Sequence, residues 1–159
     1  MNSLYLRTDS GFREATQDEV IAEAQFLIST RFHTGSALME NPRVIGEFLR
    51  LHLGPLDHEI FGILHLDSHH RLIQREDLFR GTLDSAQVYA RDVLQSVLTH
   101  RSAAVVFYHN HPSGNPTPSF ADEELTHRLQ KALALIDVKV LDHFIVGETV
   151  LSFSEQGLL

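Results

Sequence analysis

The chain reads AAVVFYHNHPSGNPTPSFAD over residues 103–122, and this stretch decides the fold. Residues 103–108 are small, β-branched or aromatic, and they predict a buried strand. Residues 109–118 are rich in Pro, Gly, Ser and Asn, and they predict a loop. Ser119 has the side chain of a helix N-cap, and apolar residues then recur at helical spacing to about Leu135. A strand, a loop and a helix are therefore expected in direct succession.

Strands and helices are predicted to alternate on both sides of this stretch. A capping box at residues 16–19 starts a first helix, and Asn41-Pro42 and Gly54-Pro55 delimit a second. From the apolar periodicity we expect helices over residues 17–32, 42–53 and 85–100, and strands over residues 60–66, 71–79, 138–147 and 149–153. Two helices thus precede the sheet. This order indicates an α/β or α+β fold, with helices packed on a sheet.

Composition narrows the class of protein. A chain of 159 residues with 43% apolar residues is the size of one domain with a packed core. Thirteen Lys and Arg against twenty-one Asp and Glu give a net charge of −8, so we expect no strong nucleic-acid binding. The chain has no cysteine, which excludes disulfides, thiolate zinc fingers and iron–sulfur clusters. Without a signal peptide or membrane-spanning run, a cytoplasmic location is expected.

Eleven histidines make metal chemistry the first question, and two of them have a spacing that fits a site. His109 and His111 lie two residues apart at the end of a predicted strand, so their side chains point to the same face. The loop that follows can bring Asp122, in the first turn of the next helix, back toward them. Two His and one Asp leave a fourth position for water, as in a catalytic zinc site. Such a metal lowers the pKa of bound water to about 7.

A metal-dependent hydrolase also needs a base that takes a proton from the metal-bound water. It needs a hydrogen-bond donor as well, for the oxyanion that forms on the substrate. Glu59, at the start of the first predicted strand of the sheet, is the best-placed base. Glu47 and Glu76 are the competing carboxylates, but one is predicted in a helix and the other in the middle of a hairpin. Ser119, between loop and helix, has a hydroxyl that could donate to an oxyanion.

Each of these residues also has a purely structural interpretation. Ser119 and Asp122 are spaced as a capping box, and capping can coexist with metal binding. Glu59 could be a solvated charge at a strand end. His143 is expected to hydrogen-bond within a strand pair. The other histidines have no ligand spacing and are expected to be ordinary surface or core residues: His33, His52, His58, His65, His69, His70, His100 and His127.

The motif pattern resembles a known family. The pattern of the JAB/MPN (JAMM) metalloproteases resembles the spacing found here, in which His109-x-His111 is followed after seven residues by Ser119 and after two more by Asp122. Their Glu-x-x-Gly strand resembles Glu59-Ile60-Phe61-Gly62. The string His109-Asn110-His111-Pro112-Ser113-Gly114 is similar to that of the bacterial RadC-like branch. Further similarities to that branch are Gly81-Thr82-Leu83, Asp142-His143 and Ser154-Glu155-x-Gly157. The resemblance extends from about Pro42 to the last residue.

The resemblance implies a JAB/MPN-like (cytidine-deaminase-like) mixed sheet flanked by helices over residues 42–159, after an N-terminal helical extension over residues 1–41. It implies one zinc ion held by His109, His111, Asp122 and a water, with Glu59 as the base and Ser119 as the oxyanion donor. The implied reaction is hydrolysis of a peptide or isopeptide bond in a peptide or protein substrate.

Two alternatives to a peptidase stay open. Longer RadC-like proteins carry a DNA-binding helix-hairpin-helix region, for which the first 40 or so residues here are too few and not basic. A DNA repair-associated accessory protein with a structural or vestigial metal is nevertheless one alternative. The other is a non-haem iron oxygenase, because two His and one carboxylate also bind Fe(II). The oligomeric state and any need for a partner are left open.

Overall fold

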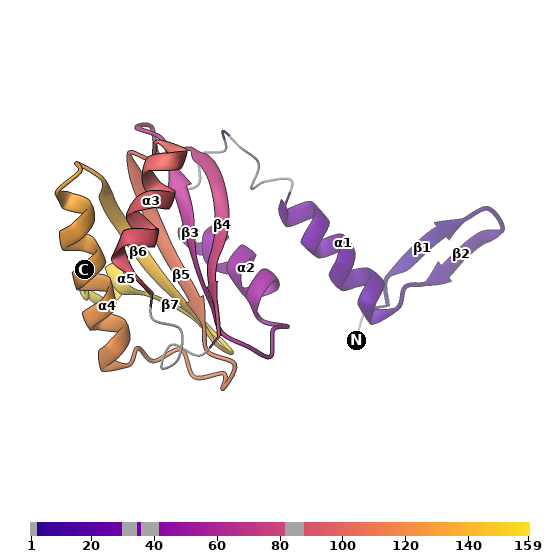
Figure 1. The fold of residues 1–159 in the computed structure, drawn as a ribbon. Coiled ribbons are helices and arrows are strands. Elements are labelled where there is room, and N and C mark those ends of the chain that lie inside the picture. Colours follow the sequence, from indigo (N-terminus) through magenta and orange to yellow (C-terminus); the bar gives the residue numbers. More distant parts are fainter. Residues whose placement is uncertain (1–2, 30–34, 36–41, 82–87) are drawn as a thin grey trace.

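A computed structural model describes residues 3–29, 35, 42–81 and 88–159. Its centre is a five-stranded mixed sheet with the order β4-β3-β5-β6-β7 (Figure 1). The strands are β3 (Ile60–Leu66), β4 (Leu72–Arg80), β5 (Ala104–Asn110), β6 (Lys139–Val146) and β7 (Val150–Ser152). Only the β5–β6 pair among these neighbours is parallel. The predicted mixed α/β fold is confirmed.

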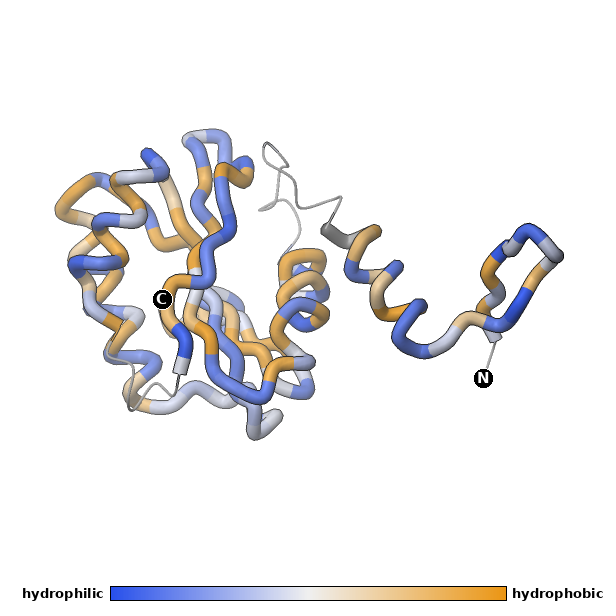
Figure 2. The backbone as a smooth tube through the Cα atoms, turned by 45° about the vertical axis from the view of Figure 1, so that its right-hand side comes forward, coloured by the Kyte–Doolittle hydropathy of each residue, from blue (hydrophilic) through white to orange (hydrophobic). Residues whose placement is uncertain are grey.

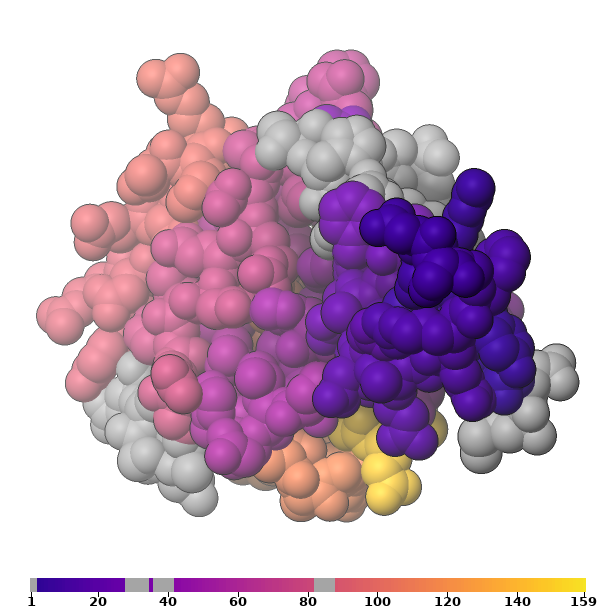
Figure 3. All heavy atoms as spheres, turned by 90° about the vertical axis from the view of Figure 1, so that its right-hand side faces the viewer, coloured from indigo at the N-terminus to yellow at the C-terminus, as the bar shows by residue number. Residues whose placement is uncertain are grey.

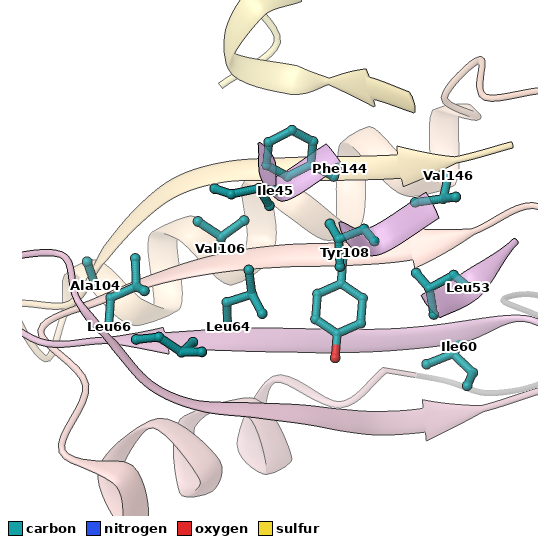
Figure 4. Packing of buried hydrophobic residues seen from close by; sticks show 12 residues of the cluster. Ile45, Leu53, Ile60, Leu64, Leu66, Ala104, Val106, Tyr108, Phe144 and Val146 are labelled. Atoms are coloured by element: carbon teal, nitrogen blue, oxygen red, sulfur yellow. The ribbon is translucent and has the colours of Figure 1, made fainter. Parts of the chain in front are cut away.

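Helices cover both faces of the sheet. Helix α2 (Pro42–Leu53) packs on one face, and α3 (Ala90–His100) and α4 (Phe120–Ala134) pack on the other (Figure 1). The α2 cluster includes Tyr108 and Val106 of β5 (Figure 4). Phe107 of the same strand belongs to the α3–α4 cluster. Because side chains alternate along a strand, both faces of β5 are apolar. Figure 2 shows hydrophobic and hydrophilic residues alternating along the helices.

The strand register decides which side chains meet at the end of the sheet. Phe61 of β3 lies opposite His109 of β5, and Phe107 lies beside His143 of β6. Since paired residues share a face, these four side chains lie on the face covered by α3 and α4. His109 lies inside β5, three residues before the first proline of the predicted loop, Pro112.

Several element boundaries differ from the predictions. Strand β5 continues to Asn110, although the loop was expected from His109. A four-residue helix, α5 (Phe153–Gln156), follows β7 where only a strand was expected. Helix α1 (Gln17–Ser29) is confirmed to its last described residue. Helix α3 begins at Ala90 after the extended N-cap Tyr89, so residues 88 and 89 are not helical as predicted. Residues 85–87 and the predicted N-cap Asn41 lie outside the described residues.

The N-terminal segment contains a β-hairpin that the sequence analysis missed. Strands β1 (Tyr5–Thr8) and β2 (Gly11–Glu14) pair before α1, and the hairpin lies at the end of α1 away from the sheet (Figures 1 and 3). The predicted capping box is confirmed, because Thr16 N donates to Glu19 Oε2 at 2.9 Å and Glu19 N donates to Thr16 Oγ1 at 3.3 Å. Among the described helices, none is long and apolar enough to cross a membrane.

Gly62 makes room for the ring of Tyr108. A Cβ atom at Gly62 would lie 2.2 Å from Cζ of Tyr108, well inside van der Waals contact. The ring is fixed there because the Tyr108 hydroxyl donates to Asp77 Oδ1 at 2.6 Å. The glycine of the Glu-x-x-Gly pattern thus has a packing role on the face opposite His109.

We expect Gly62→Ala to lower the free energy of unfolding by about 1–3 kcal/mol, because the added methyl must displace a buried ring. Gly46→Ala is the matched control, since its Cβ would lie 3.5 Å from Val150 Cγ1, an ordinary contact in a helix interior. That variant should keep or slightly raise stability. Urea unfolding of both variants measures the difference, and equal stability would show that the Tyr108 ring moves freely.

Candidate metal centre

The end of β5 places two imidazoles side by side. His109 is in the strand and buried, and His111 follows it with a side-chain exposure of 14%. The amide of His111 donates to Val146 O at 2.8 Å, so the chain keeps its extended course beside β6. As predicted, both side chains point to one face. Their Nε2 atoms lie 2.9 Å apart.

Asp122 completes the cluster from the first turn of α4. Its side chain is 1% exposed, with Oδ1 3.3 Å from His109 Nε2 and Oδ2 3.6 Å from His111 Nε2. The structure therefore brings together the three residues that the sequence predicts as metal ligands. Asp122 reaches the two histidines although it is eleven residues further along the chain, because the loop between β5 and α4 turns back over the end of the sheet.

The loop is held in place by the β6–β7 turn. Gly114 O accepts the amide of Glu148 at 2.7 Å, and Gly114 N donates to His111 O at 2.9 Å. A Cβ at Gly147 would lie 2.3 Å from Gly114 O, so the close approach of the two turns requires glycine there. His111 Nδ1 donates to the carbonyl of Asn115 at 2.8 Å. This bond orients the His111 ring and leaves its Nε2 facing the cluster.

Ser119 caps α4, as its spacing from Asp122 predicts. Asp122 N donates to Ser119 Oγ at 3.2 Å, and Ser119 N donates to Asp122 Oδ2 at 2.7 Å. The Ser119 hydroxyl also donates to Asp122 Oδ2, at 2.7 Å. Its single hydrogen is therefore used by the capping box, and donation to an oxyanion requires the hydroxyl to turn away from Asp122.

The three side chains fit a tetrahedral metal ion. Neighbouring ligands of zinc with Zn–N of about 2.0–2.1 Å lie roughly 3.3 Å apart, close to the 2.9, 3.3 and 3.6 Å found here. Asp122 Oδ1 is buried and has no hydrogen-bond partner among the described residues. A buried carboxylate oxygen without a donor is costly, and a bound cation would compensate it. Two imidazoles and a carboxylate are also ligands that zinc prefers.

Burial and the charges of the cluster shift the pKa values of all three residues. Burial lowers the pKa of His109, and the carboxylates of Asp122 and Glu59 oppose this shift. The Asp122 carboxylate raises the pKa of His111. Burial would raise the pKa of Asp122, but the two imidazoles and the Ser119 hydroxyl hold it well below the ordinary value. Asp122 is thus ionised and His109 neutral, the states in which each can bind a metal.

Glu59 lies beside the cluster, directly before β3. It comes two residues before Phe61, the residue that pairs with His109. Its charge acts on the pKa of both His109 and His111. The competing carboxylates are elsewhere, because Glu47 pairs with Arg43 on α2 and Glu76 lies near His65 and His100.

The backbone around Glu59 is fixed by neighbouring strands. The Asn110 side chain spans it, with Nδ2 donating to His58 O at 2.9 Å and Oδ1 accepting from Ile60 N at 2.8 Å. Gly81 N donates to the carbonyl of Glu59 itself at 2.9 Å. The middle residue of His109-Asn110-His111 therefore positions Glu59, a role that sequence spacing did not reveal.

A second cluster of His65, Glu76 and His100 was not predicted. The rings of His65 and His100 stack with centroids 4.3 Å apart, and His65 Nε2 lies 3.4 Å from Glu76 Oε2. Here the polar atoms have protein partners: His65 bonds to Ser96 and Ser102, and Glu76 also accepts from Ser96. The cluster is a satisfied hydrogen-bond network, unlike the one with the partnerless Asp122 oxygen.

His143 hydrogen-bonds within a strand pair, as predicted, but its partner is a residue of the cluster: His143 Nε2 of β6 lies 2.8 Å from His109 Nδ1 of β5. Its Nδ1 lies 2.7 Å from Thr126 Oγ1 of α4, a contact that the sequence analysis missed. The neighbouring Asp142 has a structural role, because its carboxylate accepts from Ser152 Oγ at 2.6 Å and from Ser154 N at 3.0 Å. Asp142 thereby fixes the start of α5.

Comparison with known proteins agrees with this geometry. The family described as the RadC-like JAB domain matches residues 39–158. A UPF0758 protein of Vibrio cholerae serotype O1 is 46% identical over 147 residues, which cover 92% of both chains. UPF0758 proteins of Leptothrix cholodnii and Nitrosomonas eutropha are 56% and 54% identical, over 77% of this chain. The chain spans only 55% of the length of these two relatives. The chain belongs to the RadC-like JAB domain family.

Proposed function

We propose that this protein is a zinc-dependent peptidase that hydrolyses a peptide or isopeptide bond in a peptide or protein substrate. The observation that carries the proposal is the convergence of His109, His111 and Asp122 around a buried carboxylate oxygen that has no hydrogen-bond partner among the described residues. Structural networks such as the one at His65 satisfy their own polar atoms, whereas this cluster leaves an acceptor for a cation. Membership of a JAB domain family supports the same class of site.

Each residue of the site has a defined task in this proposal. His109, His111 and Asp122 would hold one zinc ion, which when bound lowers the pKa of a water to about 7 and polarises the substrate carbonyl. Glu59 accepts the proton of the attacking water, because it is a carboxylate beside the cluster and outside the ligand set, and it returns this proton to the leaving amine nitrogen as the C–N bond breaks. The Ser119 hydroxyl leaves Asp122 and donates to the oxyanion that develops on the carbonyl oxygen.

The two alternatives lack support of this kind. An iron oxygenase with the same ligands has no use for a base at Glu59 or a donor at Ser119. A DNA-associated accessory role would need phosphate contacts, and the net charge of −8 disfavours them. We expect no salt-dependent DNA binding at physiological ionic strength, which fluorescence anisotropy with duplex DNA measures. Tight binding that weakens as salt rises would favour the accessory role.

The first test is the metal content of the purified protein. We expect about one zinc per chain in the wild type and none in His111→Ala, because His111 supplies one of three protein ligands. His127→Ala is the matched control, since His127 is exposed on α4, outside the cluster. Elemental analysis after incubation with zinc, iron and manganese separates the metals. A wild type that takes up no metal would refute the site, and a preference for iron would favour the oxygenase.

A further inference from the structure

A continuous chain of buried hydrogen bonds links two of the proposed metal ligands, His109 and Asp122. It passes from His109 Nδ1 to His143 Nε2 at 2.8 Å, from His143 Nδ1 to Thr126 Oγ1 at 2.7 Å, and from Thr126 Oγ1 to Asp122 O at 2.6 Å. The chain thus begins at the side chain of one ligand and ends at the backbone of another. All four residues have an exposure of 0% or 1%, so water does not substitute for any of these contacts.

Counting hydrogens fixes the direction of every bond in the chain. The carbonyl of Asp122 can only accept, so the single hydroxyl hydrogen of Thr126 is donated to it. Thr126 Oγ1 must then accept from the Nδ1–H of His143. His143 is fully buried among three aromatic rings, and among the described residues its two nitrogens contact only His109 and Thr126, so no carboxylate compensates a charge on the ring. A buried imidazole without such a partner is neutral, and with its hydrogen on Nδ1 its Nε2 carries a lone pair. Consequently His109 Nδ1 donates, and the lone pair of His109 lies on Nε2.

We propose that His143 and Thr126 are positioning residues that hold His109 in the tautomer whose Nε2 lone pair faces Asp122 and His111. This inference rests on the proposed metal centre, and it adds the hydrogen bonds that keep His109 in the tautomer able to bind the metal. Without the chain, the opposite tautomer would be favoured, because an Nε2–H of His109 could donate to Asp122 Oδ1, only 3.3 Å away. A protonated Nε2 cannot bind a metal. Asp122 Oδ1 accepts no hydrogen bond from the residues that the structure describes, which agrees with the metal-ready tautomer.

The surroundings of His143 keep its ring in one orientation. Phe61 and Phe107 meet the ring edge-on, with centroids 5.8 and 5.9 Å away, and Phe153 packs against it at 4.7 Å. These three rings come from β3, β5 and α5, and they exclude water from the imidazole. A rotation of His143 would place its nitrogens against aromatic carbon. The donor and acceptor roles in this series of hydrogen bonds therefore depend on Thr126 alone.

The test removes the hydroxyl of Thr126 while keeping its shape. In Thr126→Val the Nδ1–H of His143 has no acceptor, so His143 is expected to move its hydrogen to Nε2 and to force the wrong tautomer on His109. Zinc affinity, measured by competition with a chelating dye, should fall about 10–100-fold. Thr126→Ser keeps the hydroxyl and should bind zinc as the wild type does. Nitrogen NMR of the imidazole rings in metal-free protein reads the His109 tautomer directly.

Thr99→Val is the matched control, because Thr99 Oγ1 donates to Gln95 O at 2.8 Å in the same i to i−4 arrangement, on α3. It should leave the zinc affinity unchanged. An unchanged affinity and tautomer in Thr126→Val would overturn the inference, as would an Nε2–H on His109 in the metal-free wild type. The wild-type NMR measurement needs no variant, so it decides the question even where Thr126→Val does not fold. A wild type with the expected tautomer but no zinc affinity would refute the proposed function instead.

Discussion

Glu59→Gln is expected to lower kcat/KM for peptide hydrolysis by about 10²–10⁴-fold while the protein keeps one zinc per chain. Glutamine has the shape of glutamate but cannot accept the proton of the attacking water. Zinc should stay bound, because Glu59 is outside the ligand set and its backbone is held by Asn110 and Gly81. Hydrolysis is measured on the best substrate from a library of peptides and isopeptides, and zinc by elemental analysis of the same preparation.

Glu47→Gln is the control for this prediction. Glu47 is an exposed residue of α2 whose carboxylate pairs with Arg43 at 3.1 Å, so its loss should leave both hydrolysis and zinc unchanged. Hydrolysis at the wild-type rate by zinc-loaded Glu59→Gln would show that another group accepts the proton. Loss of zinc from that variant would instead make Glu59 a ligand and require a different assignment of the site.

The parts of the site that sequence reasoning found are those held by local geometry. His109 and His111 share a face because residues two apart in a strand always do. Ser119 and Asp122 meet because a cap and the third residue of a helix are adjacent in every helix start. These pairs need no knowledge of the tertiary structure. The strands of the sheet and the helices that flank it could be predicted for the same reason, since their apolar periodicity is a local property of the sequence.

The parts that sequence reasoning missed depend on contacts between distant elements. Asn110 positions Glu59 only because β5 pairs with β3, and these residues are about fifty positions apart. His143 reaches His109 because β6 lies beside β5 in parallel, a pairing that spacing alone does not specify. The β1–β2 hairpin was missed for another reason, because its residues are mostly exposed and carry no alternating apolar pattern.

Asp122→Asn is expected to abolish stoichiometric zinc binding, because the amide provides a neutral and weaker ligand in place of the carboxylate. The wild type should gain about 4 kcal/mol of stability from zinc at 1,000 times its Kd, and the variant should gain none. Thermal unfolding with and without zinc measures this difference. In the absence of metal, the variant should still form the cap of α4, because an amide oxygen can accept from Ser119 as Oδ2 does.

The difference in stability between metal-free wild type and metal-free Asp122→Asn should also depend on pH. Asp122 raises the pKa of His111, so their attraction contributes stability below the unfolded histidine pKa of about 6.5 and is lost as pH rises through the raised pKa. Asp122 stays ionised across this window, because its own pKa lies well below the ordinary value. The stability lost in metal-free Asp122→Asn should therefore be larger at about pH 6 than at about pH 9.

Asp92→Asn is the matched control for both measurements, because Asp92 occupies the same third position of α3 but faces no histidine cluster among the described residues. Its stability change should come from the helix dipole, should vary little between the two pH values, and should leave zinc binding intact. A zinc-loaded Asp122→Asn would contradict the ligand assignment. A stability loss that is the same at both pH values would show that His111 is neutral in the metal-free protein, and that the carboxylate of Asp122 is held by its helix cap rather than by the imidazole.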